Sequence, residues 1–171
     1  MNTLDSETNV AISPDLFELE IATTIHERVD YGKRSRFVTF YCGDKLYGVA
    51  AAEVAEVVHP LPVSPFPNGP DTLIGISALR GEIVALVDLQ KVLSETSQRS
   101  QGRSKFILLR SAENETKPAF SVDRMHEIVS VSDDHISRGG ISAPGIAGEA
   151  DINGTVLHII DVRVITAAIA E

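Results

Sequence analysis

Short apolar runs of strand length, separated by turn-forming residues, recur along the chain from residue 37 onward. Such spacing is typical of an all-β fold built from small strands and hairpins. The predicted strands are Phe37–Tyr41, Leu46–Ala50, Val54–Val58, Leu73–Leu79, Glu82–Leu89, Phe106–Arg110, Pro118–Val122, Met125–Val131 and Thr155–Val162.

Helical signals occur at the two ends of the chain and at one short turn. Ser13-Pro14-Asp15 combines an N-cap serine, a proline at the first helical position and an acid in the first turn, and predicts a helix that ends near Gly32. Leu89–Leu93 predicts a single helical turn, and Val162–Ile169 predicts a short closing helix.

Loops are predicted where apolar runs are absent. Five prolines between residues 60 and 70 predict a stiff, extended loop, because proline cannot donate a hydrogen bond within a central strand. Ser94–Ser104 is rich in Ser, Gln and Arg and predicts a linker or exposed loop. Glu113–Lys117 is predicted to be a polar turn, and Ser132–Gly145 a loop.

A pattern of roughly seventy residues occurs twice in the sequence, which suggests a small barrel repeated once. Glu56 matches Glu127 at a shift of 71. A shift of 73 relates three further pairs, which are Gly75 and Gly148, Gly81 and Gly154, and Asp88 and Asp161. We expect an N-terminal extension over 1–35, a first repeat over about 37–93 and a second over about 106–169, with two lobes sharing a core.

The two copies differ at one hairpin turn. The second copy has Asn153-Gly154, the preferred pair for a two-residue loop in which both residues have positive φ. The first copy has Arg80-Gly81 at the same place, although arginine tolerates that backbone less well than asparagine. Two interpretations remain open: Arg80 is at the tip for a function, or it pairs with an acid in a turn of different geometry.

Composition and charge exclude several classes of protein. The formal net charge of −9 disfavours binding to nucleic acid and adsorption to anionic lipid. Cys42 is the only cysteine, so no internal disulfide can form. The first ten residues lack the features of a signal peptide, and no apolar run approaches the ~20 residues of a membrane helix. We therefore expect a cytoplasmic protein without direct membrane insertion.

No constellation of catalytic residues emerges from the sequence. The five histidines lack metal-ligand spacing, and no phosphate-binding glycine loop is present. Cys42 has no basic neighbour, which favours an inert thiol. Asp88 and Asp161 each precede a short apolar helical stretch, so capping of that turn is the preferred interpretation. We expect no enzymatic activity, no metal site and no cofactor.

Several motifs resemble the CheW-like domain, the coupling module of bacterial chemosensory arrays. The similarity covers about residues 36–169. It rests on F-V-T-F-Y-C-G-D-K-L-Y-G-V, V-A-E-V-V, the proline-rich loop, I-G-I-S-A-L-R-G-E-I-V-A-L-V-D-L and F-S-V-D-R-M-H-E-I-V. The resemblance implies two SH3-like five-stranded barrels with a shared hydrophobic interface, which agrees with the duplication.

The resemblance also implies a role. CheW-like proteins bridge methyl-accepting chemoreceptors to the regulatory domain of a CheA-type histidine kinase, at receptor arrays on the inner face of the membrane, without catalytic activity. By position, the receptor-binding residues are Arg80, Glu56, Val54, Gly75 and Met125, and Val63 lies near the surface used for the kinase. The alternative is a small regulatory or ligand-binding β-barrel that acts outside receptor arrays.

Overall fold

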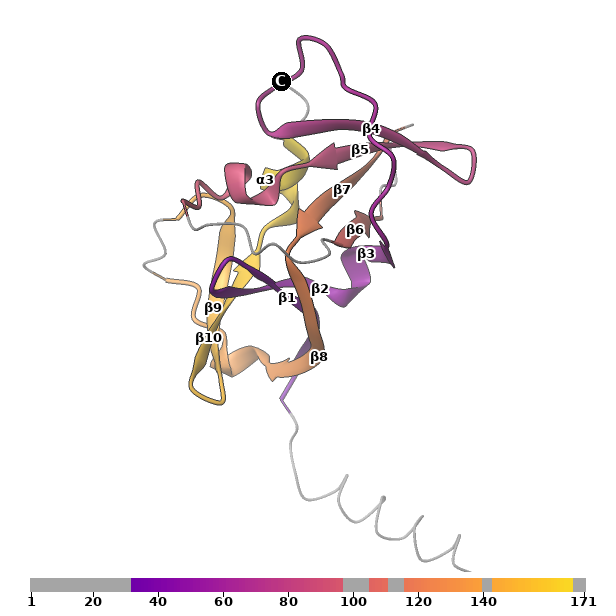
Figure 1. Cartoon of the computed structure of the whole chain (residues 1–171). Helices are drawn as coiled ribbons and strands as arrows, with labels where there is room; N and C mark the ends of the chain where they lie inside the picture. Colours follow the sequence, from indigo (N-terminus) through magenta and orange to yellow (C-terminus); the bar gives the residue numbers. More distant parts are fainter. Residues whose placement is uncertain (1–31, 97–104, 111–115, 140–142, 168–171) are drawn as a thin grey trace, which may run out of the picture. The chain divides into compact units, whose positions relative to one another are not determined.

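The computed structural model describes residues 32–96, 105–110, 116–139 and 143–167, and these form two five-stranded β sheets (Figure 1). The predicted N-terminal helix and most of the predicted linker Ser94–Ser104 lie outside the described residues. The predicted fold class, mostly β with two five-stranded lobes, is confirmed.

Each lobe is one sheet. The first, in spatial order, comprises β8 (Arg124–Ser132), β1 (Arg34–Cys42), β2 (Lys45–Ala50), β10 (Thr155–Ile160) and β9 (Ile146–Ile152). The second comprises β3 (Val54–Val58), β6 (Lys105–Leu109), β7 (Thr116–Val122), β5 (Glu82–Val87) and β4 (Leu73–Leu79). The helical elements are η1 (Ala51–Glu53), α2 (Leu89–Val92), η2 (Asp133–His135) and α3 (Val162–Ala167).

The two sheets exchange strands between the sequence repeats. β1 and β2 belong to the first repeat but pair with β8 and β10 of the second, and β6 and β7 of the second repeat pair with β3 and β5 of the first. In each sheet the crossover is one parallel pairing, β2 with β10 and β5 with β7. A lobe is therefore assembled from two strands of one repeat and three of the other.

Most predicted elements are confirmed, including the short helices α2 and α3, but β9 was missed. Its sequence, Ile146–Ile152, lacks an apolar run, so the apolar pattern did not identify it, although the shift of 73 from Leu73–Leu79 and the hairpin turn at Asn153-Gly154 both point to a strand there. Two residues of the predicted turn Glu113–Lys117, Thr116 and Lys117, begin β7, because they pair with the parallel strand β5. β1 begins at Arg34, ahead of the predicted start.

A shared core joins the two lobes. It takes side chains from both sheets and both short helices, and its members are Val38, Phe40, Cys42, Tyr47, Val49, Val54, Val87, Leu89, Val92, Leu93, Ile107, Leu109, Phe120, Val122, Ile160 and Ile165. Each lobe also has a core of its own, centred on Leu46 and Leu157 in the first sheet and on Val84 and Leu86 in the second.

The central strands are buried on both faces. In β6, Phe106 and Leu108 enter the core of their own lobe, whereas Ile107 and Leu109 enter the shared core. This division follows the two-residue period of a strand. It explains why the central strands are nearly continuous apolar runs, as expected for a strand without a solvated face.

One prediction concerns the shared core. Phe120 is completely buried there and its ring centroid lies 5.5 Å from that of Phe40. We expect Phe120→Ala to lower the free energy of unfolding by about 3–5 kcal/mol, because it leaves a cavity that both lobes line. Denaturant unfolding combined with amide hydrogen exchange should show faster exchange in both β4 and β10.

The half-exposed Val57, on the edge strand β3, supplies the control. Val57→Ala should cost less than about 1 kcal/mol. Faster exchange in only one lobe of the Phe120→Ala protein would contradict a core shared by both.

Candidate functional site

Arg80 and Asn153 occupy equivalent turns with the same backbone conformation. Arg80 and Gly81 have φ values of 50° and 82°, and Asn153 and Gly154 have 53° and 85°. Both turns therefore place two successive residues in the left-handed region, as predicted for Asn153-Gly154. The part of the alternative that expected a different turn geometry at Arg80 is wrong, whereas the part that expected Arg80 to pair with an acid is confirmed by its contact with Glu56. The first repeat therefore keeps an arginine where asparagine is preferred.

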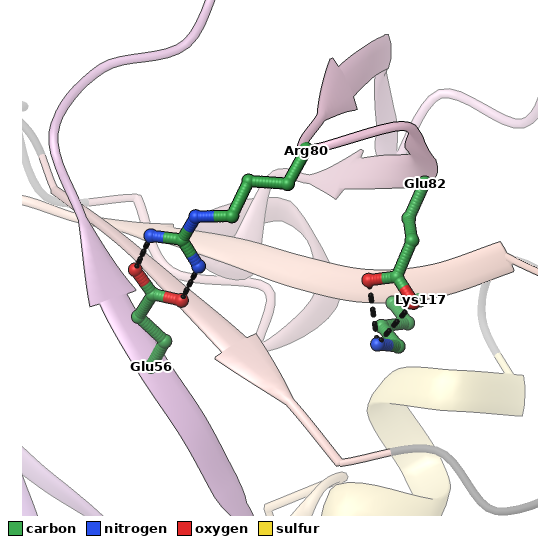
Figure 2. A network of polar contacts seen from close by, with 4 residues as sticks. All are labelled: Glu56, Arg80, Glu82 and Lys117. Carbon is green, nitrogen blue, oxygen red and sulfur yellow. Dashed lines mark hydrogen bonds and ion pairs between the residues drawn. The ribbon is translucent and has the colours of Figure 1, made fainter.

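The Arg80 guanidinium meets the carboxylate of Glu56 end-on, in a bidentate contact, and Glu56 projects from the edge strand β3 (Figure 2). Both of its terminal nitrogens donate to Glu56, each over 2.6 Å. The side chain of Arg80 nevertheless remains 70% exposed and that of Glu56 32% exposed. The pair is thus fixed in geometry and open to a partner.

A second ion pair lies beside the first. Lys117 of β7 donates to both carboxylate oxygens of Glu82, over 2.8 and 2.6 Å, and Glu82 follows the Arg80 turn by two residues (Figure 2). Sequence reasoning missed this pair, because the two residues meet only through the parallel pairing of β5 with β7. Nothing in the local pattern around Lys117 indicates that neighbour.

The ion pair shifts the pKa of both partners. Hydrogen bonding from Arg80 holds the pKa of Glu56 below its ordinary value, and Glu56 in turn raises the pKa of Arg80. The pair therefore stays charged at neutral pH. A guanidinium has five N–H donors, and Glu56 occupies two of them, which leaves three to contact a partner.

Val54 and Met125 lie at the junction of the lobes. Val54 is buried in the shared core, where only 8% of it is exposed, and Met125 of β8 packs against that core while partly buried. The structure thus brings these two predicted site residues to one core, but it does not leave the Val54 side chain on the surface.

Gly75 lies where the proline-rich loop crosses β4. A Cβ atom at this position would be 2.5 Å from the carbonyl oxygen of Ser64 and 2.7 Å from Cγ1 of Val63. The loop is held there by two backbone hydrogen bonds between Ser64 and Ile76, of 2.8 and 2.9 Å. Gly75 therefore permits a close crossing and presents no side chain to a partner.

This crossing brings together two residues that were assigned to different surfaces. Val63, predicted to lie near the kinase surface, is in direct contact range of Gly75, predicted for the receptor surface. Val63 is 44% exposed, and Phe66, which the sequence analysis did not single out, is 54% exposed in the same loop. The second lobe repeats the crossing, with Ser137 bonded to Glu149 beside Gly148.

The residues that were candidates for a reactive role, Cys42, Asp88 and Asp161, have structural roles. Cys42 is buried, and burial, reinforced by the charge of Asp123, raises the pKa of its thiol to about 12. Asp88 accepts a hydrogen bond from the backbone N–H of Lys91, and Asp161 from that of Arg163, which confirms both as caps. Among the described residues, no three metal-binding side chains gather in one place.

Comparisons with known proteins agree with this geometry. The model of the CheW-like domain matches residues 36–170. The chain belongs to the CheW-like domain family. The chemotaxis protein CheW of Treponema pallidum is 28% identical over 153 residues, covering 82% of this chain and 89% of that protein. That of Helicobacter pylori is 24% identical over 118 residues, covering 68% and 70%.

Solved structures place the fold in the same family. The crystal structure of the scaffolding protein TtCheW from Thermoanaerobacter tengcongensis superposes with a TM-score of 0.68 at 25% identity, covering 76% of this chain and 86% of that one. As a CheW-like protein, this chain is a chemotaxis scaffold that couples chemoreceptors to a CheA-type kinase. The comparisons give no support to a regulatory barrel outside receptor arrays. In the part of the chain that the structure describes, no helix could span a membrane.

The Gly75 crossing yields a stability prediction for this CheW-like fold. Gly75→Ala should lower the free energy of unfolding by about 1–3 kcal/mol, because the added methyl group meets backbone that must shift. Gly139→Ala is the control, since a Cβ there meets nothing within 4 Å. Thermal unfolding of both variants checks this, and equal stabilities would show that the loop moves away freely.

The ion pair yields a titration prediction. In the wild type, the pKa of Glu56 should lie below the value of about 4.3 for an unperturbed glutamate, because Arg80 stabilises the carboxylate. Arg80→Asn should return it to that value. Because the folded-state pKa is depressed, any stability from the pair is present above the unfolded pKa and is lost as the pH falls through the folded pKa.

Carboxyl chemical shifts followed by NMR during an acid titration measure this pKa. An unchanged Glu56 pKa in Arg80→Asn would mean that the pair does not form in solution.

Proposed function

We propose that the Glu56–Arg80 pair is the centre of the surface with which this scaffold binds the chemoreceptor. The observation that supports this most is the retention of arginine, with φ of 50°, at a turn where the equivalent residue of the second repeat is asparagine. Asparagine satisfies the turn better, so the arginine contributes something other than the hairpin.

The bidentate contact prepares Arg80 for binding. A free arginine loses rotational freedom when a partner immobilises it, and a guanidinium already held by Glu56 avoids part of that loss. Its three remaining donors suit carbonyl or carboxylate groups on the partner. Exposed apolar residues lie close to the pair along the chain, Val57 next to Glu56 on β3 and Ile83 three residues after Arg80 on β5, and they suit the apolar face of an amphipathic helix.

The other receptor residues contribute indirectly in this proposal. Val54 and Met125 form the apolar support at the junction of the lobes, and methionine adapts to an irregular surface. Gly75 acts by holding the proline-rich loop, which carries Val63, close to β4. Val63 and its exposed neighbour Phe66 then form an apolar surface for the regulatory domain of the kinase.

We further propose that the protein has no catalytic activity of its own and acts at receptor arrays on the inner face of the membrane. The buried, weakly acidic thiol of Cys42 and the capping roles of Asp88 and Asp161 support the first point. Membership of a family of scaffold proteins supports both.

The test is affinity capture of receptor and kinase with three forms of the full chain: wild type, Arg80→Asn and Lys117→Gln. Arg80→Asn installs the residue that the second repeat already has in this turn, so its melting temperature should be unchanged or raised by a few degrees. It should lose most receptor binding and retain the kinase.

Lys117→Gln is the matched control, because it removes a cation from the neighbouring ion pair of Figure 2 without touching Arg80. It should retain both partners. Retention of the receptor by Arg80→Asn, or its equal loss in Lys117→Gln, would contradict the assignment of Arg80. A destabilised Arg80→Asn protein would show that the pair serves the fold.

A further inference from the structure

A pocket of about 530 Å³ lies on the first sheet, where β1 begins and β2 ends. Its walls are Arg34, Ser35 and Arg36 of β1 together with Ala50, Ala51 and Ala52, which end β2 and start η1. The three small side chains leave the space open, and the two arginines supply the charge. None of these residues belongs to the Glu56–Arg80 surface, which lies on the second sheet.

Neither arginine is neutralised by an acid within the described residues. Arg34 donates to neutral groups of Ser130, to its hydroxyl over 3.1 Å and to its carbonyl oxygen over 2.7 Å. Arg36 is exposed and has no ion pair there. The nearby carboxylate of Asp133 accepts a hydrogen bond from Ser35 over 2.7 Å and pairs with neither arginine.

The spacing of the arginines defines what they can bind. Residues two apart on a strand lie on one face, about 7 Å from each other. Two carboxylates at i and i+4 on a helix are separated by a rise of about 6 Å, which matches this spacing. The pairing of β1 with β2 begins only at Phe37, so Arg34–Arg36 pair with β8 alone, and the two arginine side chains set the charge and spacing that a ligand must match.

We propose that this pocket binds an acidic segment of a partner protein. One carboxylate of the segment pairs with Arg34 and another with Arg36, and the apolar part of the segment lies over the alanines. Guanidinium and carboxylate groups make paired, charge-assisted hydrogen bonds. The net charge of −9 over the whole chain opposes every anionic ligand, and most strongly a highly charged one such as nucleic acid or an anionic lipid surface, so a short segment with two carboxylates is favoured over these. A single phosphate would fill little of the volume and leave the apolar floor uncovered.

The experiment measures binding of a fluorescent, alanine-based helical peptide with two glutamates at i and i+4 to the full chain by anisotropy. The wild type should bind it, and added salt should weaken binding. The same peptide with glutamines should fail to bind. Arg36→Gln should weaken binding about tenfold, the effect of losing one charge-assisted contact, and Arg34→Gln combined with Arg36→Gln should abolish it.

Two controls distinguish this pocket from general attraction and from misfolding. Arg138→Gln removes one exposed positive charge elsewhere on the chain and should leave binding unchanged. Arg36→Gln breaks no hydrogen bond among the described residues, so its melting temperature should equal that of the wild type. Arg80→Asn should also bind normally, which keeps this result independent of receptor coupling.

Three outcomes would overturn the proposal. The wild type could fail to bind the peptide, or Arg138→Gln could weaken binding as much as Arg36→Gln. The third is binding to phosphatidylglycerol vesicles, or to inorganic phosphate in a competition assay, with the same dependence on Arg36 but without binding to the peptide.

Discussion

The structure depends on one constraint: the central strands β1, β2, β6 and β7 must bury both of their faces. One face fills the core of a lobe and the other fills the shared core, so neither lobe can close without the other. Polar side chains that bind a partner are consequently excluded from the middle of these strands and are confined to turns, edge strands and strand ends. Arg80 lies at a turn and Glu56 on the edge strand β3, the kinds of position that this constraint leaves available.

The two equivalent hairpin turns, at Arg80 and at Asn153, differ in what their residues contribute. Asn153 keeps the turn residue that the backbone favours, and the acid before it, Asp151, accepts a hydrogen bond from the N–H of Gly154. Arg80 adopts the same backbone without that local support, and its side chain reaches Glu56 on another strand. One copy is thus optimised for the turn, while the other combines the turn with a charged group held in place.

Local pattern was sufficient for most strands, both short helices and the turn conformation, because apolar period and turn chemistry are properties of neighbouring residues. It could not show that β2 pairs with β10, since the pairing of distant strands leaves no local signal. The resemblance to the family assigned Val54 and Gly75 to the receptor surface. In the structure, Val54 packs in the shared core, and Gly75 lies where the proline-rich loop crosses β4. The alanine-lined pocket could not be predicted from the sequence, because its arginines and alanines come together only in the folded sheet.

The exchange of strands between repeats also sets the order in which the two sheets can form while the chain is synthesised on the ribosome. The second sheet uses one continuous stretch of chain, from Val54 to Val122, so all five of its strands can pair once that stretch has emerged, although its face toward the shared core stays uncovered until the first sheet forms. The first sheet begins with β1 and β2 but needs β8, β9 and β10, the last strands to be made. The earliest apolar strands therefore wait longest for their partners, and during that interval they are the segments most exposed to aggregation and to chaperones.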